Sequence, residues 1–174
     1  MSSRWMKAGP NHVPSYQSSG IPFVTTSNGP FEVKGIDGNS ASANPVHIQF
    51  PFVTRFFTIQ NIGSNVLRVG FTPDGVFAPG EMLPNGTAKG ADLSRNYFTI
   101  PTGSGGAALG ATSQLTCEIR CKDLYFMSNA SDNSPGNAQA TGFSILAGLT
   151  TIPRDAFPLL TGSINGTGSF KGVG

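Results

Sequence analysis

Residues 55–72 decide how we interpret the fold, and they read Arg-Phe-Phe-Thr-Ile-Gln-Asn-Ile-Gly-Ser-Asn-Val-Leu-Arg-Val-Gly-Phe-Thr. Apolar residues alternate with other residues in both halves: Phe57 and Ile59 in the first, and Leu67, Val69 and Phe71 in the second. Successive side chains of a strand point to opposite faces, so this alternation predicts two half-buried strands, with Arg68 on the polar face. Gly63, Ser64 and Asn65 between them are turn residues, so we expect a β-hairpin.

The same pattern recurs on both sides of this stretch and gives about eight strands. The others are expected at 31–33, 46–50, 97–100, 115–122, 124–127 and 142–149, with a further one considered at 22–26. In the strand 115–122, one face carries Leu115, Cys117, Ile119 and Cys121, and we expect it to pack against the apolar face of the central stretch. The connections are long, which favours a single jelly-roll β-sandwich. An immunoglobulin-like sandwich would need turns every 8 to 12 residues.

The composition favours one β domain with a surface that is poor in charge. The chain has 174 residues and a net charge of +2, and 11% of its residues are charged, against about 25% in average proteins. This is not the charge pattern of a nucleic-acid binder. A surface rich in hydroxyl and amide groups is compatible with burial against neighbouring subunits. An ordinary extracellular-type β domain is the alternative.

Both ends of the chain are expected to be extended arms. Residues 1–30 contain Pro10, Pro14, Pro22 and Pro30, which forbid a long helix, yet they are too apolar for a freely solvated tail. We expect this arm to bind a surface, and a first strand of the domain around 22–26 is the alternative. The domain proper is placed at 31–152 and the C-terminal tail at 153–174. No run of about 20 apolar residues predicts a transmembrane segment, and the N-terminus lacks the apolar core of a signal peptide.

No catalytic, cofactor-binding or metal-binding residues are expected. Cys117 and Cys121 would lie about 13 Å apart in a strand, too far for a disulfide, which needs Cα atoms within about 7 Å. Two sulfurs without a nearby histidine do not predict a zinc site, and His12 and His47 are far apart in the sequence. The aspartates lie in predicted turns, where they commonly bind their own backbone: Asp74, Asp92, Asp123, Asp132 and Asp155.

Two long connections, 73–95 and 128–140, are the expected contact regions of an assembly. Phe77, Met82 and Leu83 are the expected anchors of the first. Asn85, Asn129 and Asn165 match the glycosylation acceptor, and their modification is left open.

The order of several motifs resembles a known family. They are Pro-Ser-Tyr-Gln at 14–17, Ser-Gly-Ile-Pro-Phe-Val at 19–24, Phe-Thr-Ile-Gln-Asn at 57–61, Leu-Arg-Val-Gly-Phe-Thr at 67–72, and Gly-Phe-Ser-Ile-Leu-Ala-Gly-Leu-Thr at 142–150 followed by Ile152 and Pro153. Together they resemble the penton, or vertex, capsid protein of large icosahedral double-stranded DNA viruses, the algal giant viruses and their relatives.

The resemblance implies a structural protein rather than an enzyme. It implies a jelly roll of which five copies form a homopentamer at each fivefold vertex, set among major capsid proteins and, as further neighbours, minor capsid proteins. The protein would be made in the host cytoplasm and located in the virion, with no direct contact to nucleic acid. The alternatives are a lectin-like binding module on a virion or cell surface and, third, a cupin-type enzyme, against which the missing His-x-His pair argues.

Overall fold

The computed structural model describes residues 20–27, 45–63, 65–78, 81, 96–102, 113–128 and 141–158. This part of the chain forms eight strands and one short 3-10 helix. The strands are β1 (Ile21–Ser27), β2 (Val46–Gln49), β3 (Phe52–Asn61), β4 (Leu67–Gly70), β5 (Tyr97–Ile100), β6 (Gln114–Cys117), β7 (Asp123–Ser128) and β8 (Phe143–Pro153), and the helix is η2 (Arg154–Ala156).

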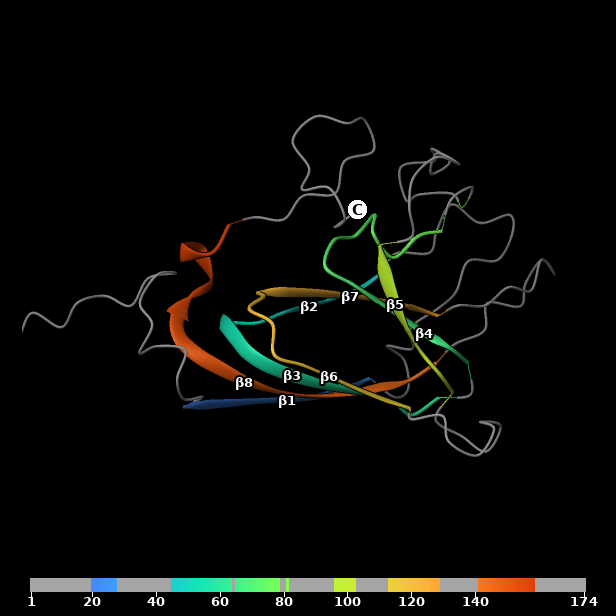
Figure 1. Cartoon of the computed structure of the whole chain (residues 1–174), viewed down its shortest axis with the longest axis horizontal. Helices are drawn as coiled ribbons and strands as arrows, with labels where there is room; N and C mark the ends of the chain where they lie inside the picture. Colours follow the sequence, from blue (N-terminus) through green and yellow to red (C-terminus); the bar gives the residue numbers. More distant parts are fainter. Residues whose placement is uncertain are drawn as a thin grey trace, which may run out of the picture.

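The strands form two four-stranded antiparallel sheets that lie face to face (Figure 1). We call them the β1 sheet, with the order β1-β8-β3-β6, and the β2 sheet, with the order β2-β7-β4-β5. The predicted all-β sandwich is confirmed. Four of the pairs are nested along the chain, since β4 pairs with β5, β3 with β6, β2 with β7 and β1 with β8.

The predicted hairpin between the two halves of 55–72 is wrong. β3 belongs to the β1 sheet and β4 to the β2 sheet, so the chain crosses from one sheet to the other between them. Asn61, the buried last residue of β3, holds this crossing. Its amide nitrogen donates to the carbonyls of Asn65 at 2.7 Å and Pro101 at 2.8 Å, and its Oδ1 accepts from Gly63 N at 3.0 Å and from the Thr141 hydroxyl at 2.9 Å. These bonds satisfy the buried side-chain atoms of Asn61.

The core fills the space between the sheets. Four of the expected inward residues of the central stretch are buried, namely Phe57, Ile59, Leu67 and Val69, whereas Phe71 is only partly buried and packs against the core. Phe126 of β7 and Phe143 of β8 stack with their ring centroids 4.2 Å apart and so join the two sheets. The sequence correctly separated the inward face of each central strand from its outward face, even though it paired the strands wrongly.

The long strand predicted at 115–122 ends early. β6 stops at Cys117, where Leu115 and Cys117 pack against the core as expected, but Ile119 is 38% exposed and does not belong to the core. The alternation breaks because the Thr54 side chain binds the segment that follows β6. Its hydroxyl donates to the Ile119 carbonyl at 2.8 Å and accepts from Cys121 N at 2.9 Å.

Residues 71–78 cover part of the outward face of the β2 sheet. The ideal Cβ position at Gly70 lies 2.7 Å from Val76 Cγ1, so a side chain at position 70 would collide with this covering segment. Arg68 points outward as predicted but is buried by the cover. Its guanidinium pairs with both carboxylate oxygens of Glu81 at 2.7 and 2.8 Å and lies 4.9 Å from the centre of the Tyr97 ring.

The segment that the sequence analysis assigned to an N-terminal arm contains β1, which is an edge strand of the sandwich. β1 pairs with β8 over its whole length, so the alternative of a strand around 22–26 is confirmed and the domain begins before residue 31. Phe77 is buried, as expected of an anchor. Several other expectations lie outside the described residues: the strand at 31–33, the arm before residue 20, Met82 and Leu83, His12, Asp92, Asp132, the three asparagines of the acceptor motifs, the segment 129–140 and the tail after 158.

Candidate functional site

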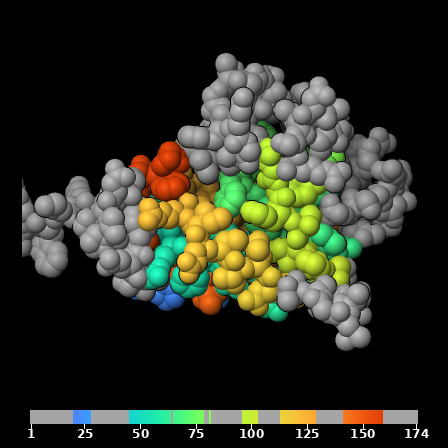
Figure 2. Space-filling model, viewed as in Figure 1, coloured from blue at the N-terminus to red at the C-terminus, as the bar shows by residue number. Residues whose placement is uncertain are grey.

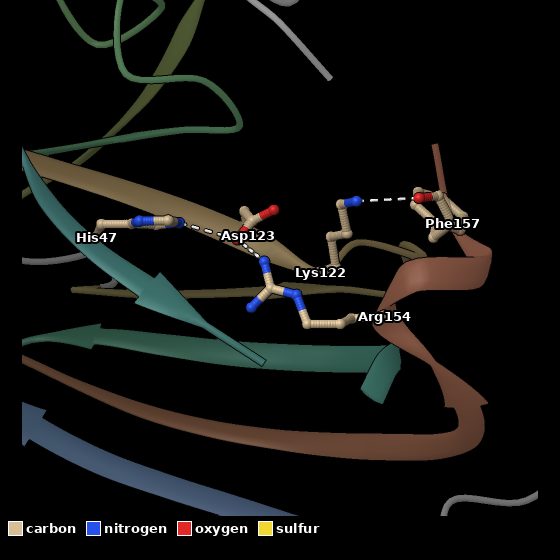
Figure 3. Close-up of polar contacts among 5 residues, drawn as sticks. All are labelled: His47, Lys122, Asp123, Arg154 and Phe157. Carbon is tan, nitrogen blue, oxygen red and sulfur yellow. Dashed lines mark hydrogen bonds and ion pairs between the residues drawn. The ribbon is translucent and has the colours of Figure 1, made fainter. Parts of the chain in front are cut away.

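A polar cluster lies where β2, β7 and the end of β8 meet (Figure 3). His47 and Tyr125 are register partners, and their rings stack in parallel at 4.3 Å. His47 Nε2 lies 2.8 Å from Asp123 Oδ1, and Arg154 Nη2 donates to the same oxygen at 3.0 Å. The carboxylate therefore joins a side chain from β2 to one from η2.

Asp123 does not have the role that the sequence indicated. It was expected to bind its own backbone in a turn, but it is the first residue of β7 and binds two side chains that lie 76 and 31 positions away. Its side chain is 11% exposed. No local pattern reports such distant partners, which explains why the cluster could not be found from the sequence.

A second bond beside this cluster holds the segment after β8. Lys122 Nζ donates to the Phe157 carbonyl at 3.0 Å, and Phe157 packs against Val53 and Ile152. We call the five residues His47, Lys122, Asp123, Arg154 and Phe157 the C-terminal clasp. The clasp ties the chain that leaves β8 of the β1 sheet to the start of β7 in the β2 sheet (Figure 3).

The clasp has the character of a structural tie. Cys121 immediately precedes Lys122, but burial raises the pKa of its thiol to about 12, and a protonated thiol is a poor nucleophile. Burial also raises the pKa of the Cys117 thiol, and both cysteines are free. Within the described ranges, no three histidine, cysteine or acidic side chains gather as a metal site would require.

The outward face of the β1 sheet is a second feature, and eleven of its residues form an area without charged side chains. Its residues lie in three rows across the strands: Pro22, Gly148 and Phe56 in the first, Val24, Leu146, Thr58 and Thr116 in the second, and Thr26, Ser144, Gln60 and Gln114 in the third. We call these eleven residues the uncharged face. Arg55, in the irregular part of β3 beside Phe56, is the charged residue among the strands of this sheet, and Glu118 and Arg120 follow the end of β6.

The uncharged face exposes apolar side chains in its middle row. Val24 is 68% exposed and Leu146 is 47% exposed, and they are register partners on β1 and β8. Their hydroxyl neighbours bond to each other across the strands, Thr58 to Thr116 at 3.0 Å and Thr26 to Ser144 at 3.2 Å. The sequence indicated a surface poor in charge, but only the register shows that these positions adjoin.

Within the described part of the chain, the two faces of the sandwich are covered unequally. Residues 71–78 lie over the β2 sheet, whereas Figure 1 shows no labelled strand or helix on the outward side of the β1 sheet. On the side seen in Figure 2, the atoms of residues 113–128, in amber, lie beside those of 96–102, in yellow-green.

Among the residues described, no helix has the length and apolar character needed to cross a membrane.

Comparison with protein-family models, curated proteins and solved structures found no match for this chain. The class of the protein is therefore defined by its own architecture, an all-β sandwich of two four-stranded antiparallel sheets.

Proposed function

We propose that this chain is a structural capsid protein, five copies of which close a fivefold vertex of an icosahedral double-stranded DNA virus shell. The observation that carries the proposal is the nested strand pairing, from β4 with β5 outward to β1 with β8. A chain folded as one long antiparallel hairpin and wound into two sheets produces this order. This order is the one expected of a single jelly roll, the eight-stranded sandwich of two Greek keys that viral capsid domains use, and so it supports the proposal.

The family resemblance and this pairing support each other. The motif residues 21–24 lie in β1, 57–61 in β3, 67–70 in β4 and 143–150 in β8. Three of these strands are neighbours in the β1 sheet. The motifs thus coincide with structural elements and not with a group of reactive side chains, as expected of a protein whose role is to assemble.

The distribution of charge also supports a subunit of a shell. The uncharged face would lose no charge hydration on contact with a neighbour, and unpaired buried charges are what make many protein contacts unfavourable. In the proposed setting the pentamer is surrounded by major capsid proteins, with minor capsid proteins as further neighbours, and it is located in the virion after synthesis in the host cytoplasm. The connections 73–95 and 128–140 remain our proposed axial and lateral contacts.

The native mass of the purified protein tests this function. A pentamer has about five times the 18.1 kDa mass of one chain. A monomer at every accessible concentration, or a trimer, would contradict the vertex role and favour the binding module. A glycan-binding screen would then test the lectin-like reading directly.

A further inference from the structure

The uncharged face is suited to a partner that brings no charge to it. Burying a charged side chain without a partner is costly, and this face offers only apolar, hydroxyl and amide groups. A partner surface of average composition, with about 25% charged residues, would bury some of its charged side chains against this face without an opposite charge to pair with. This chain has 11% charged residues, so another copy of the chain meets the requirement better than an average protein does.

The four hydroxyl groups of the uncharged face already have hydrogen-bond partners within the protein. Thr58 bonds to Thr116, and Thr26 bonds to Ser144, across neighbouring strands. A buried hydroxyl without a hydrogen bond destabilises the state in which it is buried. These four hydroxyls keep a partner when a neighbour excludes water, which lowers the cost of covering the middle and third rows.

The size of the face decides between an isolated pair and a larger assembly. Four strands about 4.8 Å apart, with three rows of side chains about 6.6 Å apart, span roughly 400 Å². A stable pair of proteins usually needs about 800 Å² on each partner. One such contact would hold two copies only weakly, whereas in a closed ring each copy has two neighbours and every contact supports the others.

We propose that the uncharged face is the surface on which a second copy of this chain docks. The inference rests on the proposed function, because a cyclic ring uses a heterologous contact in which one side of a subunit meets a different side of the next. Residues 71–78 already cover part of the outward side of the β2 sheet, so we expect that different side to lie elsewhere and Thr99 to stay outside the contact. Val24 and Leu146 lie at the centre of the contact and lose their exposed apolar surface there.

Two lysine substitutions on the face, with one on the opposite side, test the proposal. Leu146→Lys places a charge in the middle row, and Thr116→Lys places one at the end of the same row, on the edge strand β6. Thr99→Lys is the matched control, because Thr99 is also an exposed threonine on an edge strand, β5, but points outward from the β2 sheet. Native mass and sedimentation velocity over a concentration series give the assembly midpoint, and circular dichroism verifies folding.

We expect Leu146→Lys and Thr116→Lys to remain folded and to raise the assembly midpoint at least about tenfold, a change of about 1.4 kcal/mol in free energy. Thr99→Lys should leave the midpoint near the wild-type value. If Leu146→Lys does not fold, Thr116→Lys decides the question alone, since Thr116 is exposed at the sheet edge.

The possible outcomes separate this inference from the pentamer. A wild-type pentamer that both face variants leave intact, or that Thr99→Lys weakens equally, overturns the docking surface and leaves the proposed function standing. A wild-type dimer or trimer that the face variants dissociate supports the docking surface and removes the pentamer. A wild-type chain that is monomeric at every concentration overturns both.

Discussion

Thr54 and Cys121 bind each other through both main-chain and side-chain atoms. Thr54 N donates to the Cys121 carbonyl at 2.9 Å, Cys121 N donates to the Thr54 hydroxyl at 2.9 Å, and the hydroxyl lies 3.4 Å from the Cys121 Sγ. Both residues are buried. This pair joins the irregular start of β3, where the register with β8 shifts, to the segment between β6 and β7.

Thr54→Val should therefore destabilise the fold although it preserves the side-chain shape. It leaves Cys121 N and the Ile119 carbonyl without the hydroxyl, and a buried unsatisfied polar group costs about 1–3 kcal/mol. Thr54→Ser keeps the hydroxyl and should cost clearly less. Equilibrium denaturation of both variants measures the difference, and equal stability of the two would show that the hydroxyl bonds are unimportant.

The C-terminal clasp should show energetic coupling between Asp123 and Arg154. Their side chains are only partly exposed, at a distance of 3.0 Å, so we expect a coupling free energy of about 1 kcal/mol, within the range seen for contacting residues. A double-mutant cycle with Asp123→Ala and Arg154→Ala measures it by denaturation. Additive effects within about 0.3 kcal/mol would mean that the ion pair does not hold the segment after β8.

Stability should fall in alkaline solution because of Cys121. Burial raises the pKa of its thiol to about 12 from an ordinary value of 9.0, so above pH 9 the unfolded chain loses this proton while the folded protein keeps it. The contribution to stability is complete below pH 9 and is lost as the pH rises toward 12, with a slope of up to about 1.4 kcal/mol per pH unit.

Cys121→Ala should reduce this alkaline slope in unfolding free energies measured from pH 7 to 10.5. Burial also raises the pKa of the Tyr125 hydroxyl, so a smaller slope remains in the variant. Cys117→Ala is the comparison: burial raises the pKa of Cys117 as well, but this thiol is only partly buried, so its removal should reduce the slope less than Cys121→Ala does. An identical slope in wild type and Cys121→Ala would contradict the assigned burial of the thiol.

Phe57→Ala and Thr58→Ala test the register of the central strand. Phe57 is fully buried, and truncating a core phenylalanine typically costs about 3–5 kcal/mol, enough to remove soluble protein. Thr58 points to the outward face, where its loss should cost less than about 1 kcal/mol. Soluble yield and thermal unfolding compare the two variants. If both substitutions have the same effect, the assignment of Phe57 to the core and Thr58 to the outward face is wrong.

Assembly should depend weakly on salt, because the uncharged face offers no ion pairs to be screened. Raising the ionic strength from about 0.1 M to about 1 M shortens the Debye length from about 10 Å to about 3 Å. We expect the assembly midpoint in sedimentation velocity to change by less than about threefold over this range. A steep loss of assembly with salt would point to contacts made by charged groups elsewhere.

The sequence predicted which residues lie in strands better than it predicted which strands pair. The alternation around Phe57 and Ile59 identified the buried side of β3, because burial on one face imposes a period of two. The same alternation says nothing about the partner strand. The turn residues between β3 and β4 therefore indicated a hairpin, while the side chain of Asn61 directs the chain to the other sheet.

The candidate surfaces were less predictable than the strands. The low fraction of charged residues indicated a surface fit for contact, but the positions Val24, Leu146 and Thr58 come from three strands that the sequence could not align. The clasp was missed for the same reason, since His47 and Asp123 are separated by 76 positions. Interactions between distant residues leave no trace in a local pattern.

The nested strand pairs have a consequence for how the chain folds during synthesis. Thr26 of β1 lies beside Ser144 of β8, 118 positions later, so the first strand has no neighbour in its sheet until the last strand has been made. Contacts this distant in sequence slow folding, because the chain must close a long loop before it gains them. During translation β4 and β5 are the first paired strands to emerge, whereas β1 must wait until β8, the last strand, has been made. A ribosome-bound chain that ends before residue 143 should thus remain sensitive to protease at its N-terminal strand.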